Sequence, residues 1–341
     1  MAKTWKIIRT DCEQQCPVLD EALLADGADL VLLPDGTSED ALAQEAQDAD
    51  LILMCYTPIG AKVINGAARL KGIVKYGVGI DAIDIDAAMA RGIPVVNVPD
   101  YGERTVAEGA FAMLIALAKR LPAISDAMQA QGWIWPETQW QSVDLEGKVL
   151  GLVGCGRIGQ CMAHMAGAGF GMRVLGYDPH VQDAALQAAN IVRCDELDQV
   201  LEQADFVSLH SVLTPETRAL ISTDQFKRMK PTAFLINTSR GALIDEDALL
   251  QALREGWIAG AGLDVFSKEP LSHAGHKLSP LYKMKNVLLH PHLTFFSSEA
   301  MLRLQREALA RCREVLAGKD VLVISKDPRL RAQSKGVRFK D

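Results

Sequence analysis

Side chains that suit acid–base and anion-binding chemistry follow strand-like runs in the second half of the chain. Arg240, Glu269 and His292 each stand within a few residues of the end of such a run. In an open parallel sheet, ligands bind outside the carboxyl ends of the strands, so we expect these three side chains to meet. A guanidinium holds a carboxylate, an imidazole exchanges a proton, and a carboxylate orients the imidazole. These groups are what reduction of a 2-keto acid needs.

A glycine-rich turn lies between a buried strand-like run and a helical pattern near the middle of the chain. Gly154, Gly156 and Gly159 have the spacing G-x-G-x-x-G. In a strand–turn–helix unit the first glycine permits a tight turn, the second lets the backbone approach a pyrophosphate, and the third lets helix and strand pack closely. Arg157 and Ile158 open the helix, so its N–H groups and positive dipole end face the anion. The turn therefore predicts dinucleotide binding.

The residues after the next strand-like run favour NAD over NADP. Asp178 ends that run about nineteen residues after Gly159, where an acidic residue is expected to bind the adenosine ribose. A carboxylate repels a ribose 2′-phosphate, and the segment 179–183 contains no Arg or Lys that would bind one. The predicted cofactor is therefore NAD.

Composition limits the class of protein. The 341 residues are 49% hydrophobic and 23% charged, which suits two globular domains. A net charge of −7 argues against a nucleic-acid-binding surface. The chain contains no apolar run long enough for a membrane span, and its seven scattered cysteines indicate neither a disulfide framework nor a zinc site. We therefore expect a cytoplasmic protein with no membrane or nucleic-acid partner.

The first hundred residues alternate between strand-like and helical patterns. This alternation predicts a self-contained parallel α/β unit. The strand-like runs are 6–8, 30–33, 51–55, 73–76 and 94–98, and the helical patterns are 16–25, 38–46 and 84–91.

Two features of the segment 105–141 admit more than one interpretation. Residues 105–108 have a capping-box pattern and predict the start of a helix that runs through Ala118. This helix is apolar on every face, so it must be buried all round, either in a core or in a subunit interface. Residues 131–141 hold three tryptophans and a proline, which is typical of a dimer arm or of a cover over a core.

Strand-like runs recur after the glycine turn and predict a second doubly wound sheet. They are 149–153, 174–177, 206–210, 233–237, 259–265 and 287–290. A last helix, about 298–317, is expected to pack back on the first domain. The predicted fold is thus α/β, with a flavodoxin-like substrate domain (1–100 and 294–325), a Rossmann NAD-binding domain (101–293) and a basic tail (326–341) that is solvated or packs on a partner.

The chain resembles the D-isomer-specific 2-hydroxyacid dehydrogenase family over about residues 5–325, with its motifs in the same order. The family's nucleotide domain also interrupts its substrate domain, as here. Besides the glycine turn, the resemblance rests on the segments 76–81 (YGVGID), 105–108 (TVAE), 209–210 with 214–217 (LH and TPET), 237–241 (NTSRG), 263–266 with 269–270 (LDVF and EP) and 291–292 (PH).

The resemblance implies three catalytic residues. His292 would protonate the substrate carbonyl oxygen as hydride arrives from NADH and would act as the base in the reverse direction. Glu269 would hydrogen-bond the other ring nitrogen and fix the tautomer. Arg240 would hold the carboxylate and the carbonyl of the substrate together.

The resemblance also implies residues that bind ligands. The substrate would be bound by Tyr76, Gly77, Val78, Gly79, Arg240 and His292, with the N–H groups of Val78 and Gly79 cradling the carboxylate. The cofactor would be bound by Thr105, Gly154, Gly156, Arg157, Ile158, Gly159, Asp178, His210, Thr217, Thr238, Ser239, Arg240, Asp264 and His292.

Each polar residue also has a purely structural interpretation. Arg240 suits a structural ion pair, Glu269 a solvated loop acid, Asp264 a strand-end cap and His210 a core histidine. His290 and His292 have the spacing of a metal-binding pair, but no cysteine or third histidine lies close in sequence, so no metal is predicted.

Departures from the family pattern bear on the substrate. Ala82 replaces the usual Asn, and Val212 replaces the usual Pro. The segment 293–299 is bulky and aromatic, similar to the branch that includes the C-terminal-binding protein corepressors and their bacterial dehydrogenase relatives. We therefore expect a small or apolar keto acid, such as glyoxylate, hydroxypyruvate or a pyruvate-like acid, and a homodimeric enzyme. The alternative hypothesis is an NADH-sensing interaction protein with little turnover.

Overall fold

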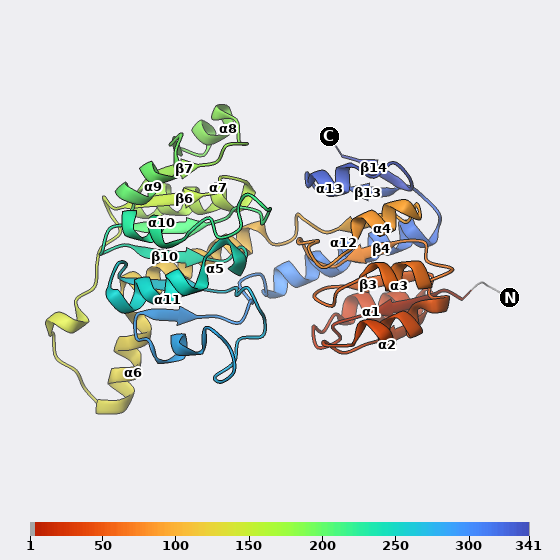
Figure 1. Ribbon diagram of the computed structural model, residues 1–341, viewed down its shortest axis with the longest axis horizontal. Coiled ribbons are helices and arrows are strands. Elements are labelled where there is room, and N and C mark those ends of the chain that lie inside the picture. Colours follow the sequence, from red (N-terminus) through yellow and green to blue (C-terminus); the bar gives the residue numbers. More distant parts are fainter. Residues whose placement is uncertain (1–3, 341) are drawn as a thin grey trace. The chain divides into compact units, whose positions relative to one another are not determined.

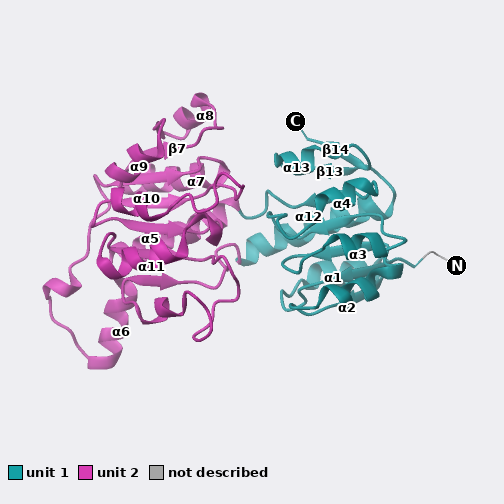
Figure 2. Ribbon diagram, viewed as in Figure 1, with its two compact units in different colours: residues 1–102, 297–341 teal, residues 103–296 magenta. Residues whose placement is uncertain are grey.

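Two parallel sheets flanked by helices organise the chain in a computed structural model that describes residues 4–340 (Figure 1). One unit, unit 1, comprises residues 1–102 and 297–341, and unit 2 comprises residues 103–296 (Figure 2). The last long helix, α12 (Ser298–Leu316), belongs to unit 1 and packs against α1 (Pro17–Ala25). The predicted return of this helix to the first domain is therefore confirmed.

Unit 1 has the strand order β2-β1-β3-β4-β5, all parallel, which is the flavodoxin-like order. Its strands are β1 (Lys6–Arg9), β2 (Asp29–Leu32), β3 (Leu51–Met54), β4 (Ile73–Lys75) and β5 (Val95–Asn97). The helices between these strands include α2 (Glu39–Glu45), α3 (Ala61–Gly66) and α4 (Ile85–Ala90). The helix α3 was not predicted, because only two of its six residues, Val63 and Ile64, are buried and too few apolar positions set its period.

Unit 2 has the strand order β12-β11-β10-β9-β6-β7-β8, also parallel. Its strands are β6 (Val149–Val153), β7 (Arg173–Tyr177), β8 (Val192–Arg193), β9 (Phe206–Leu209), β10 (Phe234–Asn237), β11 (Gly260–Leu263) and β12 (Val287–Leu289). The order reverses between β6 and β9, which is the switch point where such sheets bind ligands. The predicted pair of doubly wound sheets is confirmed, and β8 is too short to have been seen in the sequence.

Helices cover both faces of the unit 2 sheet. The helices of unit 2 are α5 (Glu103–Ala118), α6 (Leu121–Gln131), α7 (Arg157–His164), α8 (Asp183–Ala188), α9 (Leu197–Gln203), α10 (Thr223–Arg228) and α11 (Glu246–Glu255), of which α6 packs on α5 and not on the sheet. Short 3₁₀ turns occupy Ala46–Asp48, Thr138–Trp140, Gly241–Leu243 and Ser279–Lys283, and a π-helical turn occupies Met165–Gly169.

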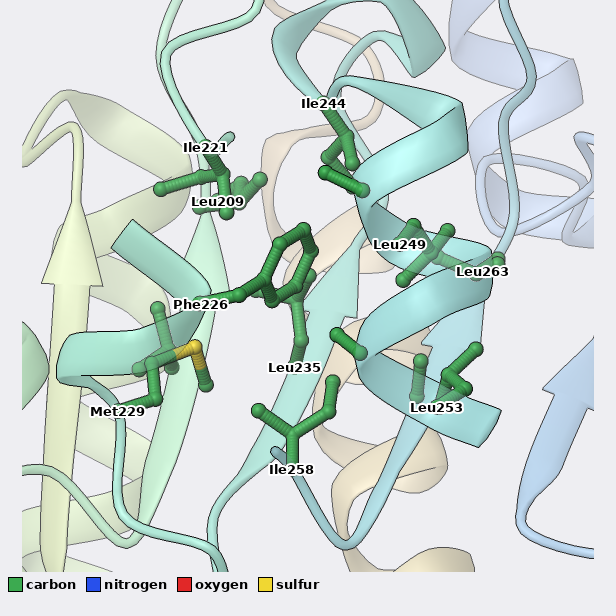
Figure 3. Close-up of a cluster of buried hydrophobic side chains, with 14 of the residues drawn as sticks. Leu209, Ile221, Phe226, Met229, Leu235, Ile244, Leu249, Leu253, Ile258 and Leu263 are labelled. Atoms are coloured by element: carbon green, nitrogen blue, oxygen red, sulfur yellow. The ribbon is translucent and has the colours of Figure 1, made fainter. Parts of the chain in front are cut away.

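The core of unit 2 has one layer on each face of its sheet. Phe226 of α10 and Leu249 of α11 pack over Leu235 of β10 on one face (Figure 3). On the other face, helices α5 and α7 contribute Phe111 and Met162 to a second cluster. Full burial of one such side chain contributes about 1.5–3 kcal/mol. These two layers fix the strands whose carboxyl ends carry the predicted site.

The helix α5 begins at Glu103, two residues before the predicted capping box, so the expected start at Thr105 is wrong. Thr105 lies in the first turn instead. The Glu103 carboxylate places a negative charge at the positive end of the helix dipole, and it forms an ion pair of 2.6 Å with Arg157.

The basic tail is folded, which contradicts the expectation of a solvated or partner-packing extension. Helix α13 (Pro328–Arg331) and strand β14 (Val337–Phe339) lie in unit 1, and β14 pairs with β13 (Val321–Val323). The Gln333 amide accepts from the N–H of Val95 (2.7 Å) and donates to its carbonyl (2.9 Å). Because β5 is an edge strand, the tail satisfies backbone groups that would otherwise stay unpaired.

The tryptophan segment 131–141 does not cover a core within this chain. Trp133 is 64% exposed and Trp135 is 73% exposed, with their ring centroids 6.4 Å apart. Of the two interpretations offered for this segment, the cover over a core is therefore wrong. No helix in residues 4–340 combines the length and hydropathy needed to cross a membrane.

Candidate active site

The first glycine of the turn after β6, Gly154, has a backbone conformation and a close contact that only glycine tolerates. Gly154 has φ +95°, and a Cβ there would lie 2.5 Å from the Ser211 nitrogen and 2.6 Å from the His210 carbonyl carbon. The turn therefore packs directly against the end of β9. A side chain at this position would strain the backbone and push the two strand ends apart.

The second and third glycines of the turn have different surroundings. A Cβ on Gly156 would meet no atom within 4 Å, whereas one on Gly159 would overlap the carbonyl oxygen of Gly154. Gly156 is also the N-cap of α7, whose first N–H groups have no acceptor inside the helix. Open space beside a helix N-terminus suits a pyrophosphate.

Asp178 follows β7 and is held by backbone donors. Its carboxylate accepts from the N–H groups of Cys155 (2.8 Å), His180 (2.9 Å) and Val181 (3.2 Å). A carboxylate has about four acceptor positions, so one remains for a ribose hydroxyl. The carboxylate thereby lies between the glycine turn and the loop after β7.

A cation that sequence reasoning missed lies against this loop. The Arg193 guanidinium on β8 donates to the Asp178 carbonyl (3.2 Å) and to the Val181 carbonyl, and it forms an ion pair with Asp183. The expectation that no arginine is present in 179–183 holds for the sequence, but the sheet brings one in from the neighbouring strand. Its charge is already compensated by Asp183.

The turn after β10 shapes the Arg240 loop. The buried Asn237 side chain accepts from the Ser239 N–H (3.0 Å) and donates to the Arg240 carbonyl (2.9 Å). The Ser239 hydroxyl donates to the Ser211 carbonyl at 2.6 Å. A Cβ on Gly241 would overlap the backbone of residues 266–267, so the Arg240 loop packs directly on the loop that leads to Glu269.

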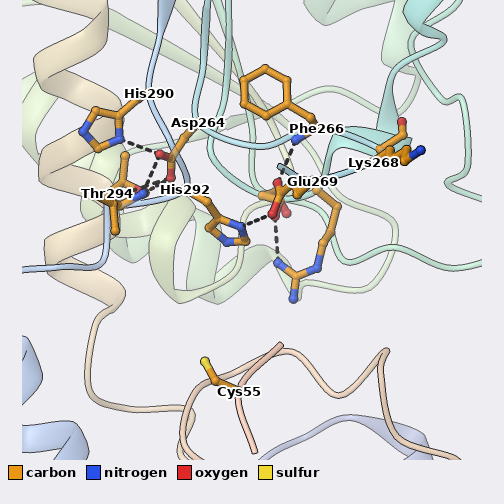
Figure 4. Close-up of polar contacts among 12 residues, drawn as sticks. Cys55, Asp264, Phe266, Lys268, Glu269, His290, His292 and Thr294 are labelled. Atoms are coloured by element: carbon orange, nitrogen blue, oxygen red, sulfur yellow. Dashed lines mark hydrogen bonds and ion pairs between the residues drawn. The ribbon is translucent and has the colours of Figure 1, made fainter. Parts of the chain in front are cut away.

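Glu269 and His292 form a hydrogen-bonded pair (Figure 4). The His292 Nδ1 lies 2.8 Å from one Glu269 oxygen, and the other oxygen accepts from the Phe266 N–H at 2.9 Å. His292 has φ +56°, a left-handed conformation that is uncommon outside glycine. The structure thus brings the three predicted catalytic loops together in unit 2 and holds the histidine in a specific orientation.

Asp264 at the end of β11 organises the histidine loop. Its fully buried carboxylate accepts from His290 Nδ1 (2.5 Å), the Leu293 N–H (2.8 Å), and the N–H (3.2 Å) and hydroxyl (2.5 Å) of Thr294 (Figure 4). These four bonds use the acceptor positions of the carboxylate. Asp264 therefore supports the loop on both sides of His292.

The other predicted cofactor residues of unit 2 lie near the strand ends. Thr238 is 8% exposed, and its hydroxyl is a buried polar atom with no hydrogen-bond partner among residues 4–340. Such an orphaned group is costly unless a ligand pairs with it. The Thr217 hydroxyl, in contrast, donates to the Val212 carbonyl (2.8 Å) and accepts from the Thr214 N–H (2.7 Å), so it closes a turn.

The predicted substrate loop lies in unit 1, after β4. Asn97 donates to the Val78 carbonyl at 2.6 Å and the Val98 N–H donates to the Gly77 carbonyl at 3.0 Å. Within the described residues, the N–H groups of Val78 and Gly79 have no acceptor. These two donors suit the predicted capture of a carboxylate.

Tyr76 does not suit the substrate role that the resemblance implied. Its side chain is fully buried, and its hydroxyl donates to the Thr10 carbonyl at 2.5 Å. Burial is the main cause that raises the pKa of this phenol well above its usual range, and the nearby Cys55 and Asp11 add to it. The expectation that this side chain contacts the substrate is therefore wrong, because it is used in the core of unit 1.

Comparisons with known proteins agree with the geometry of unit 2. A family model described as D-isomer specific 2-hydroxyacid dehydrogenase, NAD binding domain, matches residues 111–294. A glyoxylate reductase of Korarchaeum cryptofilum is 41% identical over 270 residues, which cover 78% of this chain and 80% of that protein. The chain belongs to the D-isomer specific 2-hydroxyacid dehydrogenase family. The predicted resemblance and the predicted NAD cofactor are confirmed.

Two further relatives of this dehydrogenase show the range of the family. A D-3-phosphoglycerate dehydrogenase of Methanocaldococcus jannaschii is 36% identical over 285 residues, but the match spans only 53% of its length. The crystal structure of a D-lactate dehydrogenase from Aquifex aeolicus, complexed with NAD and lactic acid, has a TM-score of 0.82 and 29% identity. That match covers 92% of the dehydrogenase described here and 97% of the solved chain.

The dehydrogenase has the features that NAD binding requires. The open space at Gly156, the N-terminus of α7 and the orphaned Thr238 hydroxyl lie in the part of unit 2 that the family model matches. Within residues 4–340, no group of three or more His, Cys, Asp or Glu side chains has the arrangement of a metal site.

The glycine turn allows a paired test of cofactor binding in the dehydrogenase. Gly156→Ala is expected to weaken NADH binding at least about tenfold, because the new methyl group fills the space reserved for the pyrophosphate. Its free energy of unfolding should fall by only about 1 kcal/mol or less, since the Cβ meets no protein atom. NADH fluorescence titration and urea unfolding measure the two quantities.

Gly154→Ala serves as the contrast, because its Cβ would strike the backbone of residues 210–211. This variant is expected to lose several times more unfolding free energy than Gly156→Ala, through a positive φ and steric overlap. Equal losses of stability in the two variants would contradict the assigned roles of these glycines.

His210 is a partly buried histidine at the end of β9. Its Nε2 lies 2.9 Å from the hydroxyl of the buried Ser208. Burial lowers the pKa of His210 from 6.5 to about 4. Any contact of this residue with the cofactor would therefore involve an uncharged ring.

The lowered pKa of His210 predicts a pH-dependent stability. Between pH 6.5 and pH 4 the unfolded chain binds a proton that the folded chain does not. The contribution of the neutral His210 side chain to the free energy of unfolding is fully present above pH 6.5. It falls by about 2–3 kcal/mol as the pH drops from 6.5 to 4. His210→Gln should lack this dependence, so the difference in unfolding free energy between the two proteins should change between pH 7.5 and pH 4. A constant difference would refute the assignment.

One anchor in unit 1 was missed. The Asp11 carboxylate accepts from the N–H groups of Cys55 (2.8 Å), Tyr56 (3.0 Å) and Thr57 (3.0 Å), and thereby fixes the loop after β3. The available signal was an acidic residue two positions after the end of β1, at the carboxyl edge of the sheet.

Proposed function

We propose that this dehydrogenase interconverts a small 2-keto acid and its D-2-hydroxy acid, with glyoxylate, hydroxypyruvate or a pyruvate-like acid as substrate. The observation that carries the proposal is the 2.8 Å contact between His292 Nδ1 and Glu269, on a loop packed against the Arg240 turn. An oriented imidazole beside a guanidinium suits proton exchange with a bound 2-keto acid.

The residues of the chain divide the reaction among them. NADH, when bound, supplies the hydride that attacks the carbonyl carbon. Because Nδ1 of His292 is hydrogen-bonded to Glu269, we assign Nε2 as the atom that donates the proton to the carbonyl oxygen. Glu269 stabilises the imidazolium through its negative charge, and Arg240 binds the substrate carboxylate. In the reverse direction His292 accepts the hydroxyl proton.

Several residues support this chemistry without touching the reacting atoms. Asp264 holds the His292 loop, and Asn237 shapes the Arg240 turn. We assign the carboxylate-binding donors to the Val78 and Gly79 N–H groups, which have no acceptor in the described chain. The Thr238 hydroxyl, orphaned and buried, is assigned to the cofactor, with Thr105, Ser239 and the residues of the glycine turn.

Aromatic residues beside the histidine favour a small substrate. The Phe295 ring lies 6.3 Å from the His292 ring in an edge-on arrangement, and Phe296 packs on Phe295 at 6.0 Å. Bulky rings next to the catalytic group leave little room for a long polar chain. The glyoxylate reductase of Korarchaeum cryptofilum, which this chain matches over 80% of that protein's length, supports the same choice.

A spectrophotometric screen tests the proposal. Initial rates of NADH and NADPH oxidation are measured in parallel with glyoxylate, hydroxypyruvate, pyruvate, 3-phosphohydroxypyruvate and bulkier 2-keto acids. We expect the highest kcat/KM with a two- or three-carbon acid and NADH. A clear preference for the phosphorylated acid, or for NADPH, would contradict the proposed substrate and the role of Asp178.

We further propose a cytoplasmic homodimer. The exposed Trp133 and Trp135 support an interface with a second copy, because large aromatic side chains are enriched in interfaces. All seven cysteines are free thiols, which suits a reducing compartment. Light scattering should give twice the mass of the 37.0 kDa chain, and Trp135→Glu should lower it towards that of the monomer.

A further inference from the structure

A pocket of about 310 Å³ lies within unit 1, between the segment after β5, helix α12 and the end of the chain near β14. Its volume is at the lower end of the range for small-molecule sites. The charged side chains that line it are Arg303, Arg306, Arg311, Lys340, Asp100 and Glu307. None of the residues that we assign to proton or hydride transfer lines this pocket.

The positive charge of the pocket is only partly compensated by the protein. Arg311 is 7% exposed and forms ion pairs with Glu307 (3.1 Å) and Glu314 (2.8 Å), so these carboxylates already have a partner. Arg306 is exposed, and within residues 4–340 it has no hydrogen bond or ion pair. The lining therefore offers a guanidinium for an anion.

A buried amide forms part of the wall of the pocket. Asn97, which lines the pocket, is 3% exposed, and its Nδ2 donates to the Val78 carbonyl at 2.6 Å. Its Oδ1 is buried and has no partner among the described residues. An oxygen without accessible surface is not reached from the pocket, so this amide belongs to the pocket wall and does not bind a ligand.

We propose that this pocket binds a small phosphate ester. Arg306 binds the phosphate, and Lys340 adds positive charge. Phosphate is favoured over a single carboxylate because its two negative charges match the two cations, Arg306 and Lys340.

Isothermal titration calorimetry with glycerol 3-phosphate tests the proposal. The full chain is first saturated with NADH, so that the pyrophosphate site in unit 2 is filled. The wild type is expected to bind the ester, and Arg306→Ala is expected to raise the Kd about tenfold, since one charge-assisted contact is lost. Arg313→Ala, an exposed arginine on the same helix that pairs with Asp26, should bind as the wild type does.

Three outcomes would overturn the proposal. They are no binding of glycerol 3-phosphate at millimolar concentration, an equal Kd for wild type and Arg306→Ala, or an equal loss in Arg306→Ala and Arg313→Ala. Arg240→Ala distinguishes this pocket from the reaction site. Binding that is lost in Arg240→Ala but kept in Arg306→Ala would place the ester at the reaction site and refute the pocket. Thermal unfolding of each variant verifies that the exposed substitutions leave the fold intact.

Discussion

His292→Ala is expected to lower kcat for 2-keto-acid reduction by about 10²–10⁴-fold, with little change in the Kd for NADH. The imidazole is the proton donor in the proposed reaction, and its orientation depends on the 2.8 Å contact with Glu269. Without it the carbonyl oxygen takes its proton from water, which is a poor acid at neutral pH. Stopped-flow measurement of NADH oxidation gives the rate, and fluorescence titration gives the Kd.

The control for this variant is His164→Ala, at an exposed histidine near the end of α7 in the same unit. Its kcat should stay within about twofold of the wild type, because surface substitutions away from a site have small effects. A His292→Ala enzyme that turns over at the wild-type rate would remove the proposed mechanism, whichever acid proves to be the substrate.

Arg240→Ala is expected to lower kcat/KM for the keto acid by about 10³-fold, which corresponds to about 4 kcal/mol of transition-state stabilisation. A guanidinium binds the substrate carboxylate through two charge-assisted hydrogen bonds, and alanine makes neither. Lysine keeps the charge but not the planar fork. Arg240→Lys should therefore recover only part of the loss, with most of the remaining defect in KM. Steady-state kinetics over a wide range of keto-acid concentration separates kcat from KM.

Arg254→Ala is the matched control, since Arg254 is an exposed residue in the last turn of α11. It should leave both constants unchanged. If kcat/KM for the keto acid is the same in Arg240→Lys and in the wild type, a positive charge alone is enough, and the paired hydrogen bonds assigned to Arg240 are wrong. If Arg240→Ala raises the Kd for NADH as much as it lowers kcat/KM, the residue serves the cofactor and not the carboxylate.

Local patterns in the sequence determined the two sheets, the nucleotide turn and the chemistry at three strand ends. Period-two and period-3.6 hydrophobicity reflects burial by neighbouring residues, so the strands and most helices could be read without knowledge of distant contacts. The glycine turn was predictable because its requirement is local: a positive φ at Gly154 and an open side at Gly156. The placement of polar residues after parallel strands then implied that Arg240, Glu269 and His292 meet.

Tertiary structure decided the features that depend on residues far apart in the chain. It buried the Tyr76 hydroxyl on the Thr10 carbonyl, brought Arg193 to the ribose loop from β8, and docked the tail on β5 through Gln333. It also gave Asp264 its four donors from residues 290–294. A hydrogen-bond partner is set by the packing of strands and loops, whereas a residue's capacity to bond is set by its type. The sequence by itself therefore determined which groups can do chemistry. Only the fold decided which of these groups already form hydrogen bonds within the protein and which stay available to a ligand.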